Sequence, residues 1–483
     1  MHPLLDRFEQ VVAADPRRVA ASDPNLTLDY GGFQAAATGL AEQVAGQSTR
    51  PRVGTLLPTS TAGAAAIFAC WYAGKTPVPL NFLLSSAELA AIVRDADLDL
   101  VLTIEPFAAD VQSLGPRSLV LNAPSLTPGR RAAPHASVRD LAVVLYTSGT
   151  SGHPKGVCLS FDNLVQNSTA CIEHARLDRD QVFLGVLPQF HTFGLTAMTV
   201  VPLLLGATVH YLPRFSPVSV VHLIEQKRIT VLMAIPSMYA ALANLKSIAR
   251  EALASLKLAI SGGEPLPPRV YQAFQERFGV TIYEGYGMTE TSPVVSLNTP
   301  WAHRPGSVGR PIPGVEVVAM DETGRTLPPG QTGELVIRGH GVMLGYHNQP
   351  AATAGALRHG ALWSGDLGYV DADGYVYITG RAKEMIIVGG ENVFPREIEN
   401  VLLEHPAVAE VAVVGIRDEV RSELPVAFVI LKEGHSATET ELREFCRARL
   451  AGYKVPRRVR IETDLPRSPT GKILKRALTL GTA

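Results

Sequence analysis

Short runs of Val, Ile and Leu alternate with helical stretches over about the first 300 residues of this chain. The runs lie at 53–57, 98–103, 182–187, 207–212, 231–235 and 256–260. Strands that alternate with helices form parallel sheets whose faces are covered by those helices. The pattern therefore predicts an α/β fold. Because 483 residues exceed what one hydrophobic core usually organises, we expect at least two domains.

The composition and pattern of the sequence change at about residue 305. Glycine and proline become frequent, and short β runs follow at 315–320, 334–338, 367–371 and 375–379. This predicts a small, mostly antiparallel subdomain that ends near residue 380. A βα pattern then resumes, with helices expected at 395–404 and 439–451 and strands at 408–416 and 426–432. We place the domain boundary at Arg381 to Lys383.

Composition and charge exclude several classes of protein. Apolar residues make up 46% of the chain and charged residues 18%, so a large core can form and disorder is not expected. The net charge of −1 disfavours a nucleic-acid-binding protein. One segment, 443–476, is strongly basic, with eleven Lys and Arg against three Asp and Glu. Such a segment suits phosphates or an acidic partner, and an ordinary solvated surface is the alternative.

The cysteines and the apolar segments predict where the protein resides. Four scattered cysteines without a C-x-x-C pattern fit a reduced, cytoplasmic protein. The first residues show no signal-peptide pattern. The most apolar segment, Gly194–Val209, is shorter than the roughly 20 residues that a bilayer requires. We interpret it as a core helix that leads into a buried strand, and we expect no transmembrane segment.

One loop carries the clearest chemical signal. Between the apolar runs 141–146 and 157–160 the chain reads Thr147-Ser148-Gly149-Thr150-Ser151-Gly152-His153-Pro154-Lys155-Gly156. Glycines allow backbone N–H groups to turn toward an anion, hydroxyls add donors and the lysine adds positive charge. The loop is not a Walker A motif, whose lysine follows glycine and precedes Ser or Thr. We interpret it as a phosphate-binding loop; a solvated Gly/Ser turn is the alternative.

Four further motifs follow this loop in a fixed order. They are Tyr283-Glu-Gly-Tyr-Gly-Met-Thr-Glu290, Trp363-Ser-Gly-Asp366, Gly380-Arg-Ala-Lys-Glu-Met-Ile-Ile-Val-Gly-Gly-Glu-Asn392 and Pro466-Arg-Ser-Pro-Thr-Gly-Lys-Ile473. With the loop, they resemble the adenylate-forming (AMP-binding) superfamily, which includes acyl-CoA synthetases, luciferases and the adenylation domains of peptide synthetases. The resemblance extends from about residue 25 to residue 476.

The resemblance implies a fold and a reaction. The expected fold has an N-terminal AMP-binding domain, 1–380, with two parallel-rich αβ subdomains and a small β-barrel-like subdomain at about 305–380. A hinge at 381–385 and a small, mobile α+β domain, 386–483, complete it. The expected enzyme is an acid–thiol ligase that joins a carboxylate to the α-phosphate of ATP and transfers the acyl group to a thiol. Both partners of the first step are anions, so their repulsion must be screened.

The resemblance assigns nucleotide-binding roles residue by residue. The phosphate loop would hold the β- and γ-phosphates, Tyr286 and Gly287 would lie at the adenine, and Thr289 would bind the α-phosphate. Glu290 is the expected Mg²⁺ ligand, with Thr147 as a weaker candidate, because hard oxygen donors suit this ion. The remaining expected contacts are Gly263, Glu264 and Pro265 beside the base, Asp366 and Arg381 at the ribose, and Lys472 between the carboxylate and the α-phosphate.

Each assignment has a simpler alternative. Tyr286 could be ordinary core packing, since aromatic residues after a strand usually are. Asp366 after Ser-Gly could form a turn. Lys472 could be a solvated cation of the basic segment. The shared order of the motifs favours the functional interpretation.

The resemblance also implies a second step. Lys383 would be the hinge about which the small domain swings. The face at Gly389, Gly390 and Glu391, together with Lys454, would then meet the pantetheine thiol. We favour coenzyme A as the acceptor, and an acyl-carrier protein is the alternative.

The acid is predicted from Leu187-Pro-Gln-Phe-His-Thr-Phe-Gly194, which resembles the element beside the acyl pocket. His191 replaces the aspartate that amino-acid-activating relatives carry after Phe190, so an α-amino acid is disfavoured; a core histidine is the alternative. Small and apolar residues would form the rest of the pocket, namely Ser237, Tyr239, Gly262 and Met288. We therefore expect an aliphatic or fatty acid, with an aryl acid as the alternative. A non-catalytic nucleotide-binding module and a luciferase-like oxygenase are more distant possibilities.

Overall fold

The computed structural model describes residues 1–122, 128–147, 154–246, 248–388, 391–418, 422–467 and 473–478. The chain forms two compact units. Unit 1 comprises residues 1–266, 270–317 and 337–362, and unit 2 comprises 267–269, 318–336 and 363–483. The predicted α/β class is confirmed, whereas the domain boundary at 381–383 stays a prediction.

A nine-stranded sheet forms the centre of unit 1. Its order is β15 (Arg310–Pro311), β14 (Val294–Leu297), β13 (Ile282–Gly287), β12 (Leu258–Ser261), β11 (Val231–Ala234), β9 (Val182–Gly185), β10 (Thr208–Tyr211), β1 (Val19–Ser22) and β2 (Thr27–Asp29). The middle strands, from β13 to β1, are parallel, and the outer pairs are antiparallel. Four of the expected strands, at 182–187, 207–212, 231–235 and 256–260, are thus confirmed as neighbours in this sheet.

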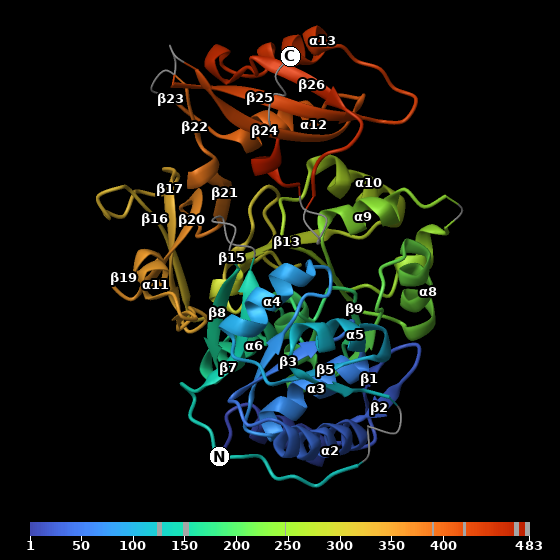
Figure 1. Cartoon of the computed structure of the whole chain (residues 1–483). Helices are drawn as coiled ribbons and strands as arrows, with labels where there is room; N and C mark the ends of the chain where they lie inside the picture. The colour runs from blue at the N-terminus through green and yellow to red at the C-terminus, as the bar shows by residue number, and fades with distance from the viewer. Residues whose placement is uncertain are drawn as a thin grey trace. The chain divides into compact units, whose positions relative to one another are not determined.

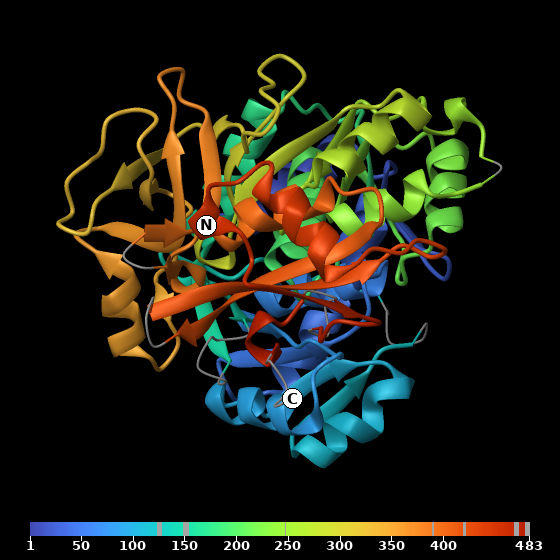
Figure 2. The same ribbon diagram turned by 90° about the horizontal axis from the view of Figure 1, so that it is seen from above.

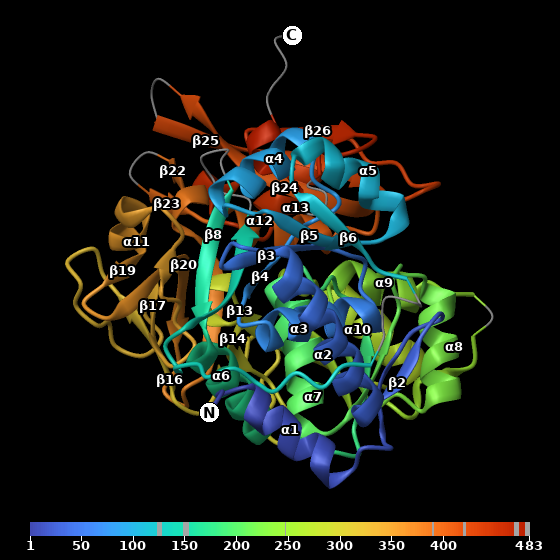
Figure 3. The same cartoon turned by 60° about the horizontal axis from the view of Figure 1, so that its bottom comes forward.

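A second, four-stranded parallel sheet is built earlier in the chain. Its order is β4 (Thr76–Pro79), β3 (Arg52–Leu56), β5 (Leu100–Thr103) and β6 (Arg117–Val120). Figure 3 shows α4 (Ser86–Asp95) and α5 (Glu105–Leu114) on one face of this sheet and α3 (Thr61–Tyr72) on the other. A capping box begins α4, because the Ser85 side chain accepts from the Glu88 N–H and Glu88 accepts from the Ser85 N–H.

The chain of unit 1 forms other helices, and Figure 1 labels most of them. They are α1 (Leu5–Ala14), α2 (Tyr30–Gln47), α6 (Phe161–His174), α7 (Val201–Leu205), α8 (Pro217–Lys227), α9 (Pro236–Ala243), α10 (Pro268–Phe278) and α11 (Pro350–Ala356). The apolar segment predicted as a core helix followed by a strand is a π-helix, Phe193–Val200, that continues into α7 and β10. In the described part of the chain, no helix has the length and apolar character needed to cross a bilayer.

Three antiparallel strands form a third sheet of unit 1, in the order β18 (Gly345–Tyr346), β8 (Lys155–Ser160) and β7 (Leu141–Thr147). The division into units runs through the β-rich segment, whose strands are β16 (Val315–Met320), β17 (Gly333–Gly339), β19 (Leu357–Arg358), β20 (Ala361–Val370) and β21 (Val376–Arg381). Within unit 2, β20 and β21 pair as an antiparallel hairpin.

The C-terminal part of unit 2 is an α+β sandwich. Its sheet has the order β23 (Glu391–Val393), β22 (Ile386–Val388), β25 (Ser422–Leu431) and β24 (Val408–Asp418), and β26 (Arg458–Glu462) pairs with β25. Figure 2 shows the two long strands, β24 and β25, side by side. The helix expected to reach Ala451 is α13 (Glu439–Arg447), which ends earlier, and a 3₁₀ turn follows at Gly452–Lys454.

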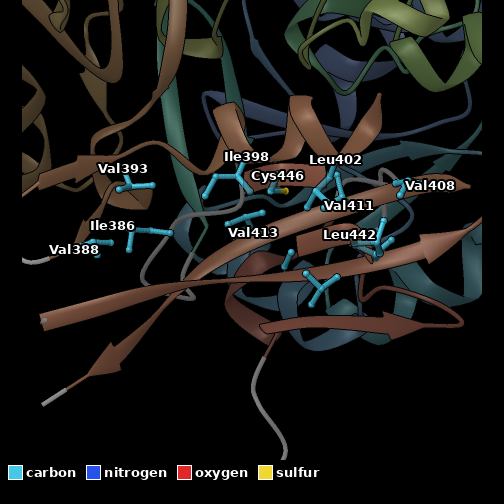
Figure 4. Close-up of a cluster of buried hydrophobic side chains, with 13 residues drawn as sticks. Ile386, Val388, Val393, Ile398, Leu402, Val408, Val411, Val413, Leu442 and Cys446 are labelled. Atoms are coloured by element: carbon cyan, nitrogen blue, oxygen red, sulfur yellow. The ribbon is translucent and has the colours of Figure 1, made fainter. Parts of the chain in front are cut away.

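The core of this sandwich lies between one face of the sheet and its two helices. Figure 4 shows Ile398 and Leu402 of α12 (Pro395–Leu403) beside Val411 and Val413 of β24. Leu442 and Cys446 of α13 belong to the same buried cluster. The four-residue spacing of both helix pairs places each pair on one helix face, so the amphipathic pattern accounts for the packing.

Buried His210 gives unit 1 a pH-dependent stability. Its Nδ1 lies 2.5 Å from the Ser22 hydroxyl across the β1–β10 pairing. Burial, with Lys227 adding to it, lowers the pKa of His210 to about 4. The unfolded chain therefore takes up this proton at higher pH than the folded one, so the free energy of unfolding falls as the pH drops below 6.5 toward 4.

We predict that His210→Gln removes about 2 kcal/mol of the stability loss that wild type shows between pH 7 and pH 5. Urea unfolding at the two pH values measures this difference. His222→Gln, on the exposed side of α8, is the matched control and should follow wild type. An unchanged pH dependence in the His210 variant would refute the assignment.

Candidate functional site

The two ends of the predicted phosphate loop are fixed by the sheet of unit 1. Thr147 ends β7 and Lys155 begins β8, and the two residues lie opposite each other in the antiparallel register. The Thr147 hydroxyl donates to the Lys155 carbonyl oxygen at 3.4 Å. Ser148, Gly149, Thr150, Ser151 and Gly152 lie outside the described residues. The sheet therefore determines the base of the loop.

Lys155 and Glu290 both contact Tyr346, which the sequence analysis did not select. Tyr346 lies on β18, opposite Val157 of β8. Its hydroxyl donates to Glu290 Oε1 at 2.8 Å, and the Lys155 Nζ lies 4.8 Å from the centre of its ring. Burial, with the Glu290 carboxylate adding to it, raises the pKa of the Tyr346 hydroxyl, which therefore remains a proton donor.

Glu290 lies in a short 3₁₀ turn, Thr289–Thr291, that several hydrogen bonds hold. The Thr291 hydroxyl donates to the Pro293 carbonyl oxygen at 2.6 Å. Asn167 Nδ2 donates to the Val294 carbonyl oxygen at 2.8 Å. Gly287 is required at the entry of the turn, because a Cβ there would lie 2.1 Å from the Pro293 carbonyl oxygen. The turn thus fixes the backbone from which the Glu290 side chain extends.

The carboxylate of Glu290 fits a Mg²⁺ ion that is bound together with nucleotide phosphates. Mg²⁺ is usually held by one or two carboxylates plus phosphate oxygens and water. Among the described residues there is no group of three or more His, Cys, Asp or Glu side chains that could hold a metal ion by themselves. A single half-buried carboxylate beside a predicted phosphate loop matches the first arrangement.

The expected adenine-binding residues gather at one sheet edge. Ser261, at the end of β12, lies opposite Glu284 of the parallel strand β13. The Glu284 side chain accepts from the Leu266 N–H at 3.1 Å, which ties β13 to the turn at 262–266. Gly263, Glu264 and Pro265 lie in this turn, and Tyr286 lies two residues beyond Glu284. Ligands of α/β proteins bind at such carboxyl ends of strands.

The predicted acyl-pocket residues differ in how deeply they are buried. His191 is exposed, so the alternative of a buried core histidine is wrong. Phe190 is buried, with its ring edge-to-face against Phe82 at 5.3 Å. Tyr239 is fully buried, and its hydroxyl donates to the carbonyl oxygens of Leu232 and Ile260, so it anchors α9 to the sheet.

Two other residues of the predicted pocket follow the ends of β11 and β13. Ser237 is exposed near the start of α9, and Met288 is half-buried before the Glu290 turn. Phe193, which the sequence analysis missed, begins the π-helix and lies against Gly262, where an added Cβ would be 3.2 Å from its ring. π-Helical segments often occur at functional sites, and their hydrogen-bond pattern is not visible in the sequence.

Asp366 and Arg381 form an ion pair in unit 2. They lie opposite each other in the β20–β21 hairpin, and Arg381 Nε is 2.8 Å from Asp366 Oδ1. The Asp366 side chain is 5% exposed, whereas Arg381 is 51% exposed. The alternative that Asp366 is a turn residue is wrong, because it lies within β20. Lys383 is exposed in the 3₁₀ turn Ala382–Glu384 that follows.

The expected thiol-acceptor residues are only partly described. Glu391 is exposed on β23. The Lys454 Nζ donates to both carboxylate oxygens of Glu397, at 2.7 and 2.8 Å, so its charge is already paired. Gly389, Gly390 and Lys472 lie outside the described residues.

Much of the basic segment is paired with acids that lie elsewhere in unit 2. Arg449 pairs with Glu404 at 3.8 Å, Arg458 with Glu439 at 3.7 Å and Arg467 with Glu410 at 2.6 Å. Lys475 Nζ lies 2.9 Å from Glu384 Oε2 and 2.8 Å from Glu399 Oε1. The folded surface therefore presents a smaller surplus of positive charge than the sequence count over residues 443–476 indicates.

The placement of the candidate site residues agrees with the comparisons to known proteins. Residues 8–347 match the family model "AMP-binding enzyme", and residues 397–472 match "AMP-binding enzyme C-terminal domain". A long-chain-fatty-acid–CoA ligase of Bacillus subtilis is 37% identical over 83% of this chain and 70% of its own length. A feruloyl-CoA synthase of Amycolatopsis is 36% identical over 95% of both chains.

Solved structures are similar over almost the whole chain. ATP-bound MatB of Rhodopseudomonas palustris has a TM-score of 0.92 and 31% identity, covering 99% of this chain and 98% of its own. The o-succinylbenzoate CoA synthetase of Bacillus subtilis with ATP and magnesium has a TM-score of 0.89 and 30% identity, covering 98% of both chains. The chain therefore belongs to the AMP-binding enzyme family, and it is an AMP-forming acyl-CoA synthetase that uses ATP, Mg²⁺ and coenzyme A, as the sequence predicted.

Proposed function

We propose that this enzyme activates an aliphatic or fatty carboxylic acid as its acyl-adenylate and passes the acyl group to coenzyme A. The observation that carries the nucleotide half of the proposal is the cluster of Lys155, Tyr346 and Glu290 at the base of the predicted phosphate loop. It presents a cation and a carboxylate close together without an ion pair between them. ATP phosphates need the cation, and their metal ion needs the carboxylate.

Several residues of unit 1 serve the nucleotide in this proposal. The loop from Thr147 to Lys155 binds the β- and γ-phosphates, and Thr289 donates to the α-phosphate. Glu290 would hold Mg²⁺, which supplies positive charge that screens the phosphates when it is bound. Tyr286 and the turn at 263–265 hold the base. Fixed groups of this kind stabilise developing charge without reorganisation.

Residues of unit 2 complete the proposal. Asp366 accepts hydrogen bonds from the ribose hydroxyls, and its pairing with Arg381 orients its carboxylate. Lys472 supplies positive charge to the reacting carboxylate and α-phosphate. Lys383 is the hinge of the second step, and Glu391 belongs to the face that receives the thiol. The carboxylate oxygen then forms a bond to the α-phosphorus as pyrophosphate leaves, and the thiol sulfur later displaces AMP from the acyl carbon.

The surroundings of the predicted pocket favour an acid without a second charge. Phe190, Phe193, Gly262 and Met288 are apolar or small, and His191 is exposed. The similarity to a long-chain-fatty-acid–CoA ligase supports an aliphatic acid. An aryl acid is the second candidate, because the feruloyl-CoA synthase is similar over a larger share of its own length.

We further propose that the enzyme works in the cytoplasm. Its four cysteines are free, and Cys70, Cys171 and Cys446 are buried. Buried thiols without disulfides are usual in a reducing compartment.

The decisive experiment is ATP–pyrophosphate exchange with a panel of aliphatic, aryl and amino acids, followed by addition of either acceptor. Exchange that depends on a fatty acid, with release of AMP after coenzyme A is added, would support the proposal. A mass increase on a phosphopantetheinylated carrier protein, with no thioester on coenzyme A, would favour the alternative acceptor. Absence of exchange with every acid would refute the proposal.

We predict that Lys472→Ala slows adenylation roughly 100-fold or more, because one positive group at the developing charge is lost. Thioester formation from supplied acyl-adenylate should change little. Lys432→Ala, at an exposed lysine of unit 2, is the control and should leave both steps unchanged. Equal losses in the two steps of the Lys472 variant would contradict the assigned role.

Arg457 is exposed in the basic segment, next to the paired Arg458. We predict that Arg457→Glu raises the KM for coenzyme A about 10-fold, since it replaces a cation near the phosphates of the acceptor with an anion. The KM for ATP should stay the same. Arg17→Glu makes the same charge change at an exposed position of unit 1. If both variants keep the wild-type KM for coenzyme A, the basic segment does not bind the acceptor.

A further inference from the structure

Tyr346 lies between a cation and an anion that would attract each other. Its ring faces the Lys155 Nζ, 4.8 Å from the ring centre, and its hydroxyl donates to Glu290 Oε1 at 2.8 Å. The structure records no ion pair between Lys155 and Glu290 themselves. The three residues come from β8, the Thr289–Thr291 turn and β18.

We propose that Tyr346 is a positioning residue that keeps Lys155 and Glu290 apart and orients both for the nucleotide and its metal ion. This inference rests on the proposed function, because it concerns the residues assigned there to ATP and Mg²⁺. Tyr346 itself touches neither the reacting carboxylate nor the α-phosphorus in this proposal.

The physical reason is that the two partners of Tyr346 use different parts of its side chain. The face of the ring attracts a cation, whereas the hydroxyl at its edge donates to a carboxylate. A hydrogen bond on Oε1 restricts rotation of the Glu290 carboxylate and leaves Oε2 for a metal ion. A direct Lys155–Glu290 pair would neutralise both groups and would have to break before ATP could bind.

The backbone of Tyr346 is held independently of its side chain. Its N–H donates to the Thr353 hydroxyl at 2.9 Å. On either side, the Leu344 N–H donates to the Cys158 carbonyl oxygen at 2.9 Å, and the His347 N–H donates to the Gly156 carbonyl oxygen at 2.7 Å. Replacing the side chain therefore leaves the strand paired, and the effect of a variant can be attributed to the side chain alone.

Two variants separate the two contacts. Tyr346→Phe keeps the ring and removes the hydroxyl, so it should weaken only the contribution of Mg²⁺ to the affinity for ATP. Tyr346→Leu removes the ring as well, so it should also weaken ATP binding in the absence of metal. The chain offers a matched control in Tyr72, a fully buried tyrosine of α3 whose hydroxyl donates to Glu9 Oε1 at 3.1 Å. Tyr72→Phe removes the same type of hydrogen bond elsewhere in unit 1.

The test is calorimetric titration of the full-length enzyme with ATP, in EDTA and over a series of Mg²⁺ concentrations. Tyr346→Phe should bind ATP in EDTA as wild type does. The gain in ATP affinity that Mg²⁺ produces should be about 10-fold smaller than in wild type, which is the size expected for the loss of one hydrogen bond to a charged group. Tyr346→Leu should bind ATP about 10-fold more weakly even in EDTA, because the loss of the ring frees Lys155. Tyr72→Phe should match wild type in both media.

A double-mutant cycle with Glu290→Gln keeps the proposal testable if the single variants are less stable than wild type. Adding Tyr346→Phe to Glu290→Gln should cause no further loss of the Mg²⁺-dependent gain. An additive loss, or a Tyr346→Phe enzyme with the full gain, would overturn the inference and leave the proposed function standing. A wild-type enzyme that binds no ATP would overturn both.

Discussion

The pairing of β8 with β7 on one side and β18 on the other is the constraint on which the nucleotide half of the site depends. Its register places Thr147 opposite Lys155 and Tyr346 opposite Val157. Neighbouring strands lie about 4.8 Å apart, so β8 and the distant strand β18 meet within one side-chain length. A shift of one residue would turn Lys155 to the other face of the sheet, away from Tyr346 and Glu290.

Most of the regular elements could be predicted because their signals are local. The alternation of apolar runs with helices predicts the parallel strands. The π-helix at Phe193–Val200 and the two-residue strand β18 carry no such signal. β18 exists because its partner β8 is present, and a pattern within the sequence cannot show a pairing between distant segments.

The candidate site also contains residues that the sequence predicts and residues that it does not. Glu290 and Asp366 were selected because they lie in motifs that resemble a known family, and the structure places both where a carboxylate can be held in one orientation. Tyr346 was missed because its role depends on two partners from other elements. The basic segment was overestimated for the same reason, since Glu404, Glu439 and Glu410 pair with it only after folding.

The two units use their charges differently. In unit 2, Lys475 contacts both Glu384, one residue after Lys383, and Glu399 of α12. Lys454 pairs with Glu397 on the same helix. These pairs satisfy charges that would otherwise be costly to bury, and they tie the segments on either side of Lys472 to the body of the sandwich.

In unit 1, by contrast, an aromatic ring separates Lys155 from Glu290. Paired charges stabilise a conformation, whereas charges that are held apart retain their attraction for a ligand. The arrangement around Tyr346 therefore suits a site whose ligand brings both the negative phosphates and the positive metal ion, because that ligand satisfies both charges at once.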